Sequence, residues 1–117
     1  MAAKFINVND IDGLEELLAR SHDEAVVLFK HSTMCPVSAS AYQEMSRFEG
    51  DVGLVVVQKA RPVSDEIEAR TGVRHESPQA LVVRGGQVVW SASHWNVTAE
   101  AVGGALKEQG GEAAGGR

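Results

Sequence analysis

The stretch AVVLFKHSTMCPVSASAYQEM, residues 25–45, decides the fold because its pattern changes partway from a strand to a helix. Residues 25–30 (AVVLFK) form an apolar, β-branched run, which predicts a strand covered on both faces of its sheet. From Pro36 to Phe48 the apolar residues recur at helical spacing, and proline is well tolerated at the first helical position. The stretch therefore predicts a buried strand, a short loop and a helix, with Cys35 at the helix N-terminus.

Segments on both sides of this stretch alternate between strand and helix patterns. Strands are predicted at residues 5–8, 53–57, 79–84 and 87–92, and helices at residues 11–21, 62–71 and 98–107. Gly50 is expected to end the helix that starts at Pro36, and Gly85-Gly86 is expected to close an antiparallel hairpin. The order predicts an α/β fold, with a mixed central sheet flanked by helices on both faces.

Length, charge and hydropathy narrow the class of protein. The 117 residues suffice for one domain, which we assign to residues 1–107, followed by a flexible Gly/Ala-rich tail at residues 108–117. The formal net charge of −5 argues against a nucleic-acid-binding surface, and no apolar run approaches the length of a membrane span. The first residues lack a signal-peptide pattern, and one cysteine cannot form an internal disulfide, so we expect a cytoplasmic protein without nucleic-acid or membrane partners.

Cys35 is the only cysteine in the chain, and two interpretations of it remain open. A lone cysteine is most often a buried, inert hydrophobic residue. At a helix N-terminus, however, free backbone N–H groups and the positive end of the helix dipole favour the thiolate, which is the reactive form. Ser38 falls on the same side of the first turn, where its hydroxyl either donates to that thiolate or only satisfies backbone amides.

Several motifs around Cys35 resemble one protein superfamily. The strand AVVLFK, the loop HSTM and the segment CPVS that opens a helix resemble the active-site segment of thioredoxins. Residues 71–90, TGVRHESPQALVVRGGQVVW, resemble the part of that fold that carries the cis-proline and its hairpin. Together with RPVS, GVRHESPQA and SHW, these motifs most resemble the monothiol bacilliredoxins of the bacillithiol system.

The resemblance implies a thioredoxin-like fold over residues 1–107 and a role for seven residues. Cys35 is the implied nucleophile, and Ser38 stands where a dithiol protein carries its resolving cysteine. The residues implied to contact substrate are Thr33, Met34, Pro36, Ser77 and Pro78, with Pro78 matching the cis-proline.

The activity implied by this resemblance is that of a monothiol thiol–disulfide oxidoreductase. It would remove bacillithiol, its low-molecular-weight thiol co-substrate, from S-bacillithiolated client proteins through a Cys35 mixed disulfide, and would act as a monomer. No metal is expected, because the four histidines and one cysteine lack metal-ligand spacing. The alternatives are a non-catalytic thioredoxin-fold binding module, a glutathione-using monothiol redoxin, or an iron–sulfur-binding monothiol redoxin.

A site for the small thiol should offer cations to its carboxylates. The candidates are Lys30, His31, Arg61, Arg74 and His75, although the default for each is a solvated surface charge. Trp95, which follows the last predicted strand, is expected to be a partly buried lid on the sheet edge rather than a platform for a ligand.

Overall fold

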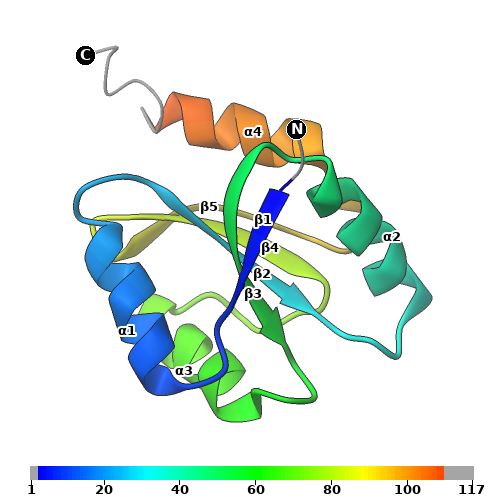
Figure 1. Ribbon diagram of the computed structural model, residues 1–117, viewed down its shortest axis with the longest axis horizontal. Helices are drawn as coiled ribbons and strands as arrows, with labels where there is room; N and C mark the ends of the chain where they lie inside the picture. Colours follow the sequence, from blue (N-terminus) through cyan, green and yellow to red (C-terminus); the bar gives the residue numbers. More distant parts are fainter. Residues whose placement is uncertain (1–2, 110–117) are drawn as a thin grey trace.

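The computed structural model describes residues 3–109, in which a five-stranded mixed sheet carries helices on both faces (Figure 1). In chain order the elements are β1 (Ala3–Asn7), α1 (Ile11–Arg20), β2 (Val26–His31), α2 (Pro36–Ser46), β3 (Gly50–Val56), α3 (Arg61–Thr71), β4 (Gln79–Arg84), β5 (Gln87–Ser93), the 3-10 turn η1 (His94–Asn96) and α4 (Ala99–Glu108). The strand order is β1-β3-β2-β4-β5, with β1, β3 and β2 parallel and β4 antiparallel to both of its neighbours. The predicted α/β architecture is confirmed.

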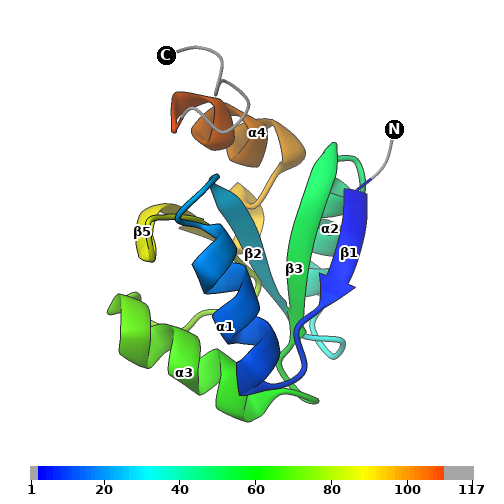
Figure 2. The same ribbon diagram turned by 60° about the vertical axis from the view of Figure 1, so that its left-hand side comes forward.

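The central strand β2 is buried along its whole length. Helices α1 and α3 lie on one face of the sheet and α2 and α4 on the other, as Figure 2 shows. Because side chains alternate along a strand, Val26 and Leu28 pack toward α1 and α3, whereas Val27 and Phe29 pack toward α2 and α4. The unbroken apolar run in the sequence reflects these two separate cores.

The ends of several elements follow their sequence signals. The Asp10 side chain caps α1 by accepting the Gly13 N–H at 2.8 Å, and Pro36 occupies the first turn of α2. Gly85 and Gly86 have φ values of 64° and 79°, the left-handed conformation that a two-residue hairpin loop requires. The predicted hairpin between β4 and β5 is confirmed.

The prediction that Gly50 ends α2 is wrong. The helix already ends at Ser46, and Gly50 begins β3 with a φ of 139°. The strand starts this early because it pairs with β1 from the register Ala3↔Gly50 onward, an interaction between segments far apart in the sequence. At the other end of the chain, α4 continues through Glu108, and residues 110–117 of the predicted tail lie outside the described residues.

Ser21, the residue that follows α1, binds the loop between β4 and β5. This loop lies at the opposite end of the sheet from Cys35. The Ser21 carbonyl accepts the Gly85 N–H at 2.7 Å, and its Oγ accepts the Gly86 N–H at 2.9 Å. The same hydroxyl donates to the Leu18 carbonyl. We call this region, Ser21 with Gly85 and Gly86, the hairpin end of the sheet.

Candidate active site

Cys35 lies between β2 and α2 and is the N-cap residue of the helix. Its backbone is extended, with φ −121° and ψ 127°, and its carbonyl accepts the Ala39 N–H at 3.1 Å. The side chain makes no capping hydrogen bond, so the sulfur is not committed to the backbone. The residue is partly exposed, so its sulfur is accessible at the N-terminal end of α2.

The loop before Cys35 is held by side chains from two other parts of the chain. Gln58, just beyond β3, accepts the Thr33 N–H at 3.3 Å through Oε1 and donates to Ser32 Oγ at 2.8 Å through Nε2. From α2, Ser38 Oγ accepts the Ser32 N–H at 3.3 Å. These contacts fix the path of the backbone that leads into the helix.

Gln58 was not anticipated from the sequence, although a signal for it exists. It follows a predicted strand, and the carboxyl ends of neighbouring parallel strands meet at the same edge of a sheet. Ser38 is fully buried, and no hydrogen bond joins its Oγ to Cys35 Sγ among the described residues. In this geometry the Ser38 oxygen supports the loop through the Ser32 N–H.

Lys30 and His31, the last residues of β2, lie on opposite faces of the sheet. Lys30 reaches α3, where its Nζ donates to the Ser64 carbonyl at 3.2 Å, whereas the His31 ring reaches Tyr42 of α2. Their exposed fractions are 0% and 9%, so the expectation of solvated surface charges is wrong for both. The physical reason is that helices cover β2 on each face up to its last residue.

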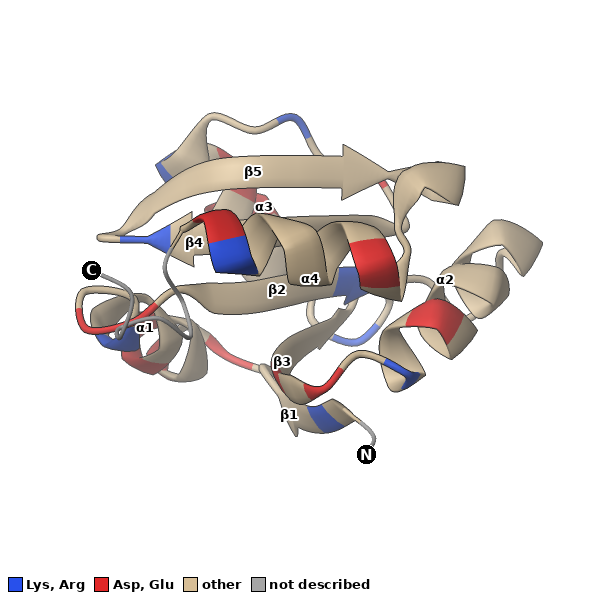
Figure 3. Ribbon diagram, turned by 90° about the horizontal axis from the view of Figure 1, so that it is seen from above, with Lys and Arg blue, Asp and Glu red and all other residues tan. Residues whose placement is uncertain are grey.

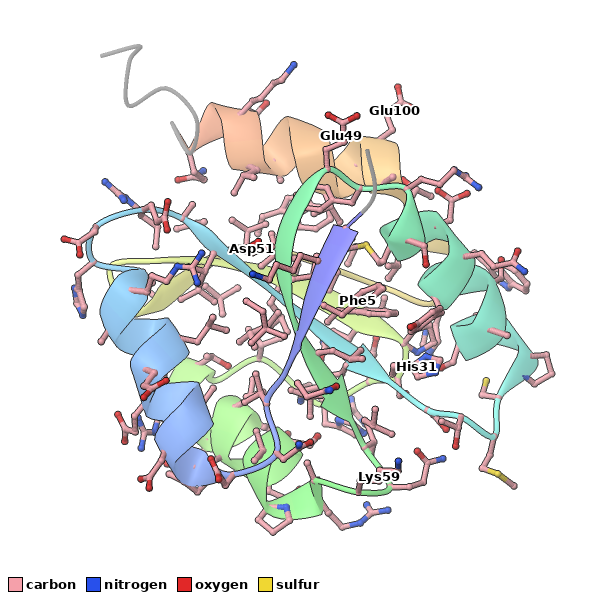
Figure 4. The ribbon with its side chains drawn as sticks, viewed as in Figure 1. Phe5, His31, Glu49, Asp51, Lys59 and Glu100 are labelled. Atoms are coloured by element: carbon pink, nitrogen blue, oxygen red, sulfur yellow. The ribbon has the colours of Figure 1, made fainter. Side chains whose placement is uncertain are left out.

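The His31 ring packs among aromatic side chains between the sheet and α2 (Figure 4). Its centroid is 5.0 Å from that of Tyr42 and 5.8 Å from that of Phe29, and Tyr42 stacks on Phe5 at 4.9 Å. Nδ1 is buried and has no hydrogen-bond partner in the described part of the chain. Burial lowers the pKa of His31, and the hydrogen bond to the Ser38 backbone opposes this shift, so the ring is held neutral near neutral pH.

Lys30 belongs to a buried cluster beneath the connection between α3 and β4. Its Nζ is 3.3 Å from His75 Nδ1, and Ser64 Oγ is 3.1 Å from the same nitrogen. Burial lowers the pKa of Lys30, while the charges of Glu68 and Asp65 act in the opposite direction. Burial, followed by the charge of Lys30, lowers the pKa of His75. The cluster ties the connection to α3 and leaves Lys30 out of reach of a ligand at Cys35.

The Ser77–Pro78 peptide bond is cis, the isomer that the family resemblance implied. Pro78 is buried, and its carbonyl accepts the His94 N–H at 2.9 Å. The next residue opens β4, which pairs with β2 so that Gln79 lies opposite Lys30. Continuation of this register places Ser77 and Pro78 beside the loop that follows β2 and leads to the helix.

Two large apolar side chains are exposed on the loops around the site. Met34 is 80% exposed, and Trp95 is 68% exposed in η1, which packs against α2. The expectation of a partly buried Trp95 lid is wrong, because the 3-10 turn carries the ring beyond the edge of the sheet. Ser77 Oγ, in contrast, is buried and has no hydrogen-bond partner within the described residues. The surroundings of Cys35 therefore combine exposed apolar surface with an unpaired polar atom.

The remaining sequence-derived candidates divide by exposure. The exposed ones are Thr33, Pro36, Arg61 and Arg74, and His75 is half-buried. No group of three or more His, Cys, Asp or Glu side chains within residues 3–109 is arranged to hold a metal ion. Nor does any helix of this part of the chain combine the length and apolar character needed to cross a membrane.

Comparison with known families agrees with this geometry. Residues 6–102 match the family described as the monothiol bacilliredoxin BrxC. A solved structure, provisionally assigned as an oxidoreductase with a thioredoxin fold, is 33% identical to this chain with a TM-score of 0.79. The similarity covers 86% of this chain and 92% of the other.

More distant structures share the fold alone. Thioredoxin from Trypanosoma brucei brucei is 12% identical with a TM-score of 0.71, and the similarity covers 90% of this chain and 89% of that chain. Thioredoxin from Malassezia sympodialis is 14% identical with a TM-score of 0.67, over 93% of this chain and 92% of that chain. The fold is therefore that of thioredoxin, as the resemblance implied.

Proposed function

The chain belongs to the monothiol bacilliredoxin family, and from this premise we propose that it removes bacillithiol from S-bacillithiolated client proteins. As a member of the family it is a thiol–disulfide oxidoreductase. The observation that carries the proposal is the position of Cys35, the single cysteine, which is partly exposed at the N-terminus of α2.

The first step is a thiol–disulfide exchange at Cys35. The Cys35 thiolate attacks the bacillithiol sulfur of a client–S–S–bacillithiol bond, and that bond breaks as the new disulfide forms. The client leaves as a thiolate and takes up a proton from water. The products are a reduced client and a mixed disulfide between Cys35 and bacillithiol, so the number of disulfides is unchanged.

The second step needs a thiol from outside the chain, because no other cysteine is present to attack the mixed disulfide. The thiolate of a second bacillithiol attacks the bound one, releases bacillithiol disulfide and restores the Cys35 thiolate. Over both steps one client mixed disulfide and one bacillithiol thiol become one client thiol and one bacillithiol disulfide.

The other residues of the site have supporting roles in this proposal. Ser38 supports the thiolate through its hydroxyl and through the loop that it holds at Ser32. The client lies across the exposed or loop-borne positions around the sulfur, namely Thr33, Met34, Pro36, Ser77 and Pro78. An extended client segment suits this arrangement, since an extended peptide can pair as a short strand with exposed backbone through main-chain hydrogen bonds.

The protein acts in the cytoplasm as a monomer and uses no metal, its partners being client proteins and the small thiol. A reducing compartment suits a chain with one cysteine. Size-exclusion chromatography with light scattering at working concentration tests the monomer, and a dimer mass contradicts it.

The decisive experiment offers the same client protein as a mixed disulfide with bacillithiol or with glutathione. Intact mass spectrometry then measures which small thiol the chain acquires. We expect the mass of bacillithiol on the wild-type chain and no gain on the Cys35→Ser variant, because a hydroxyl does not attack a disulfide under these conditions. Equal or preferred transfer of glutathione identifies a glutathione-using redoxin, and no transfer of either identifies a binding module.

A further inference from the structure

An open groove of about 740 Å³ runs along β5, on the outer side of the segment that ends in Ser77 and Pro78. Its described lining comes from the α3–β4 connection and β4, from β5 with η1, and from α4, and includes Arg74, Glu76, Gln79, Trp90, Trp95 and Thr98. This volume lies in the range of small-molecule sites. The role proposed above for Cys35 uses none of this surface.

The charged groups of the groove come from one side only. In Figure 3, β5 and the turn after it carry no Lys, Arg, Asp or Glu, so His94 is the single ionisable residue of these two elements. Opposite it, Arg74 is the single Lys or Arg among the described lining residues, and it makes no ion pair with any carboxylate of residues 3–109. Glu76 supplies a carboxylate, which lies 3.9 Å from His94 Nδ1.

The two walls are held in place by buried contacts. Gln79, only 4% exposed, donates from Nε2 to the Arg74 carbonyl at 3.0 Å and accepts the Glu76 N–H at 3.4 Å. On the opposite wall, His94 adopts a left-handed φ of 57° and donates its N–H to the Pro78 carbonyl. Arg74, Glu76 and the indole of Trp95 are therefore presented by backbone that is already fixed before any ligand binds.

The groove and the sulfur share two structural elements. Pro78 lies between the groove-lining Glu76 and Gln79 on one side and, by register with β2, the loop to Cys35 on the other. The turn that carries Trp95 packs against α2, the helix that Cys35 caps. The groove therefore borders the segment and the turn that lie next to the loop and the helix carrying Cys35.

We propose that this groove is the subsite for the sugar and dicarboxylate portion of bacillithiol, with Trp95 and Arg74 as its main contacts. The inference rests on the proposed function and deepens it by naming where the small thiol is recognised. Bacillithiol joins a cysteinyl group to a glucosamine that carries malate, so it presents an amine, a sugar ring and two carboxylates.

The sugar ring and the carboxylates each have a counterpart in the groove. The Arg74 guanidinium binds a carboxylate through paired hydrogen bonds, which an unpaired arginine offers without first breaking an ion pair. The exposed Trp95 ring provides a flat apolar face with an N–H at its edge, and the C–H face of a sugar stacks on such a surface. Glu76 provides an acceptor for the hydroxyl groups of the sugar. The groove therefore selects Arg74 from the five cations considered from the sequence.

The other four candidates do not fit this subsite. Lys30 and His31 are buried on opposite faces of the sheet, and His75 is part of the Lys30 cluster. Arg61 is exposed at the start of α3 but does not line the groove. Arg61→Gln is therefore a matched control, because it removes the same charge from a residue that does not line the groove.

A binding experiment with a thiol-free probe tests the subsite without any redox step. The probe is glucosaminyl malate, which lacks the cysteinyl group, and its affinity for the wild-type chain is measured by calorimetry together with the NMR signal of the Trp95 indole N–H. We expect saturable binding with a shift of this signal. Arg74→Gln and Trp95→Ala should each weaken binding by about tenfold, whereas Arg61→Gln should stay within about twofold of wild type.

A kinetic arm separates failure of the subsite from failure of the proposed function. The same client is offered as a mixed disulfide with bacillithiol or with cysteine, which lacks the sugar and malate. Arg74→Gln should raise KM for the bacillithiol substrate about tenfold. For the cysteine substrate, KM should stay within about twofold of the wild-type value. Transfer by wild type with no probe binding, or an equal effect of Arg61→Gln, overturns the subsite alone. Failure of wild type to take up bacillithiol at Cys35 overturns the function, and the subsite with it.

Discussion

The two ends of the sheet are formed by the same strands, but they differ in whether their buried polar groups are hydrogen-bonded. At the hairpin end, Ser21 uses both its carbonyl and its hydroxyl to bind the amides of Gly85 and Gly86. At the end that carries Cys35, the buried atoms His31 Nδ1 and Ser77 Oγ have no hydrogen-bond partner among the described residues.

The two most exposed large apolar side chains of residues 3–109 lie at the Cys35 end. Met34 and Trp95 are both exposed on loops at the Cys35 end. Buried polar groups in native proteins are usually paired, and unpaired ones call for a specific explanation. An end of the sheet with a purely structural role can pair all its polar groups within the protein. An end that binds partners leaves some polar groups and apolar surface available for contact with them. We infer that the hairpin end is structural and that the Cys35 end binds partners, and four variants test this inference.

The largest change is expected from Ser38→Cys at the Cys35 end. The variant places two cysteines in a C-x-x-C arrangement at a helix N-terminus, where one thiolate can attack the disulfide of the other. We expect an internal disulfide on mild oxidation, and release of bacillithiol without a second small thiol. Intact mass spectrometry measures the loss of two hydrogens, with wild type as the control. Two free thiols after oxidation would contradict the geometry of the first helical turn.

At the hairpin end, Ser21→Ala should lower the free energy of unfolding by about 1–3 kcal/mol, because the Gly86 amide loses its buried acceptor. Transfer of bacillithiol to Cys35 should remain at the wild-type rate, since the substitution lies at the opposite end. Urea unfolding and the transfer assay measure the two effects. A slowed transfer with unchanged stability would reverse the assignment of the two ends.

A pH series tests the neutral, buried state of His31. Because burial lowers its pKa below the unfolded value of about 6.5, the unfolded state binds more protons, and stability falls as pH decreases below that value. His31→Phe should reduce the slope of unfolding free energy between pH 7 and 5.5, by at most about 1.4 kcal/mol per pH unit. The wild-type chain, measured over the same pH range, serves as the control. An unchanged slope in His31→Phe would mean that His31 is not kept neutral.

The smallest effect on stability is expected from Ser77→Ala. The variant removes a buried hydroxyl oxygen that has no partner, so the free energy of unfolding should stay within about 0.5 kcal/mol of wild type. KM for a bacillithiolated client should nevertheless rise if the Ser77 hydroxyl forms a hydrogen bond with the client. A loss of stability similar to that of Ser21→Ala would show that both ends are structural.

Much of the fold and the centre of the site follow from local pattern. The apolar run before His31, the helical spacing after Pro36 and the paired glycines at 85–86 each determine backbone geometry within a few residues. The same local logic places Cys35 at a helix N-terminus. These features were predictable because hydrogen bonds within a turn or helix and the burial of one face depend on neighbours in the chain.

Other features depended on contacts between distant segments and were missed or mispredicted. Gly50 begins a strand rather than ending a helix because β3 pairs with β1. Gln58 supports the active-site loop because β3 ends beside β2. Trp95 is exposed because the turn after β5 carries it past the sheet edge.

The alternation of strands and helices, the position of the single cysteine and the lack of a second one to resolve its disulfides all follow from the residue pattern. The environment of the charged residues around Cys35 follows instead from the packing of distant segments. Adjacent residues of a strand face opposite sides of the sheet, so Lys30 and His31 enter two different cores. Arg74, by contrast, lines a groove and makes no ion pair within residues 3–109, because burial and pairing depend on which helices and loops pack nearby.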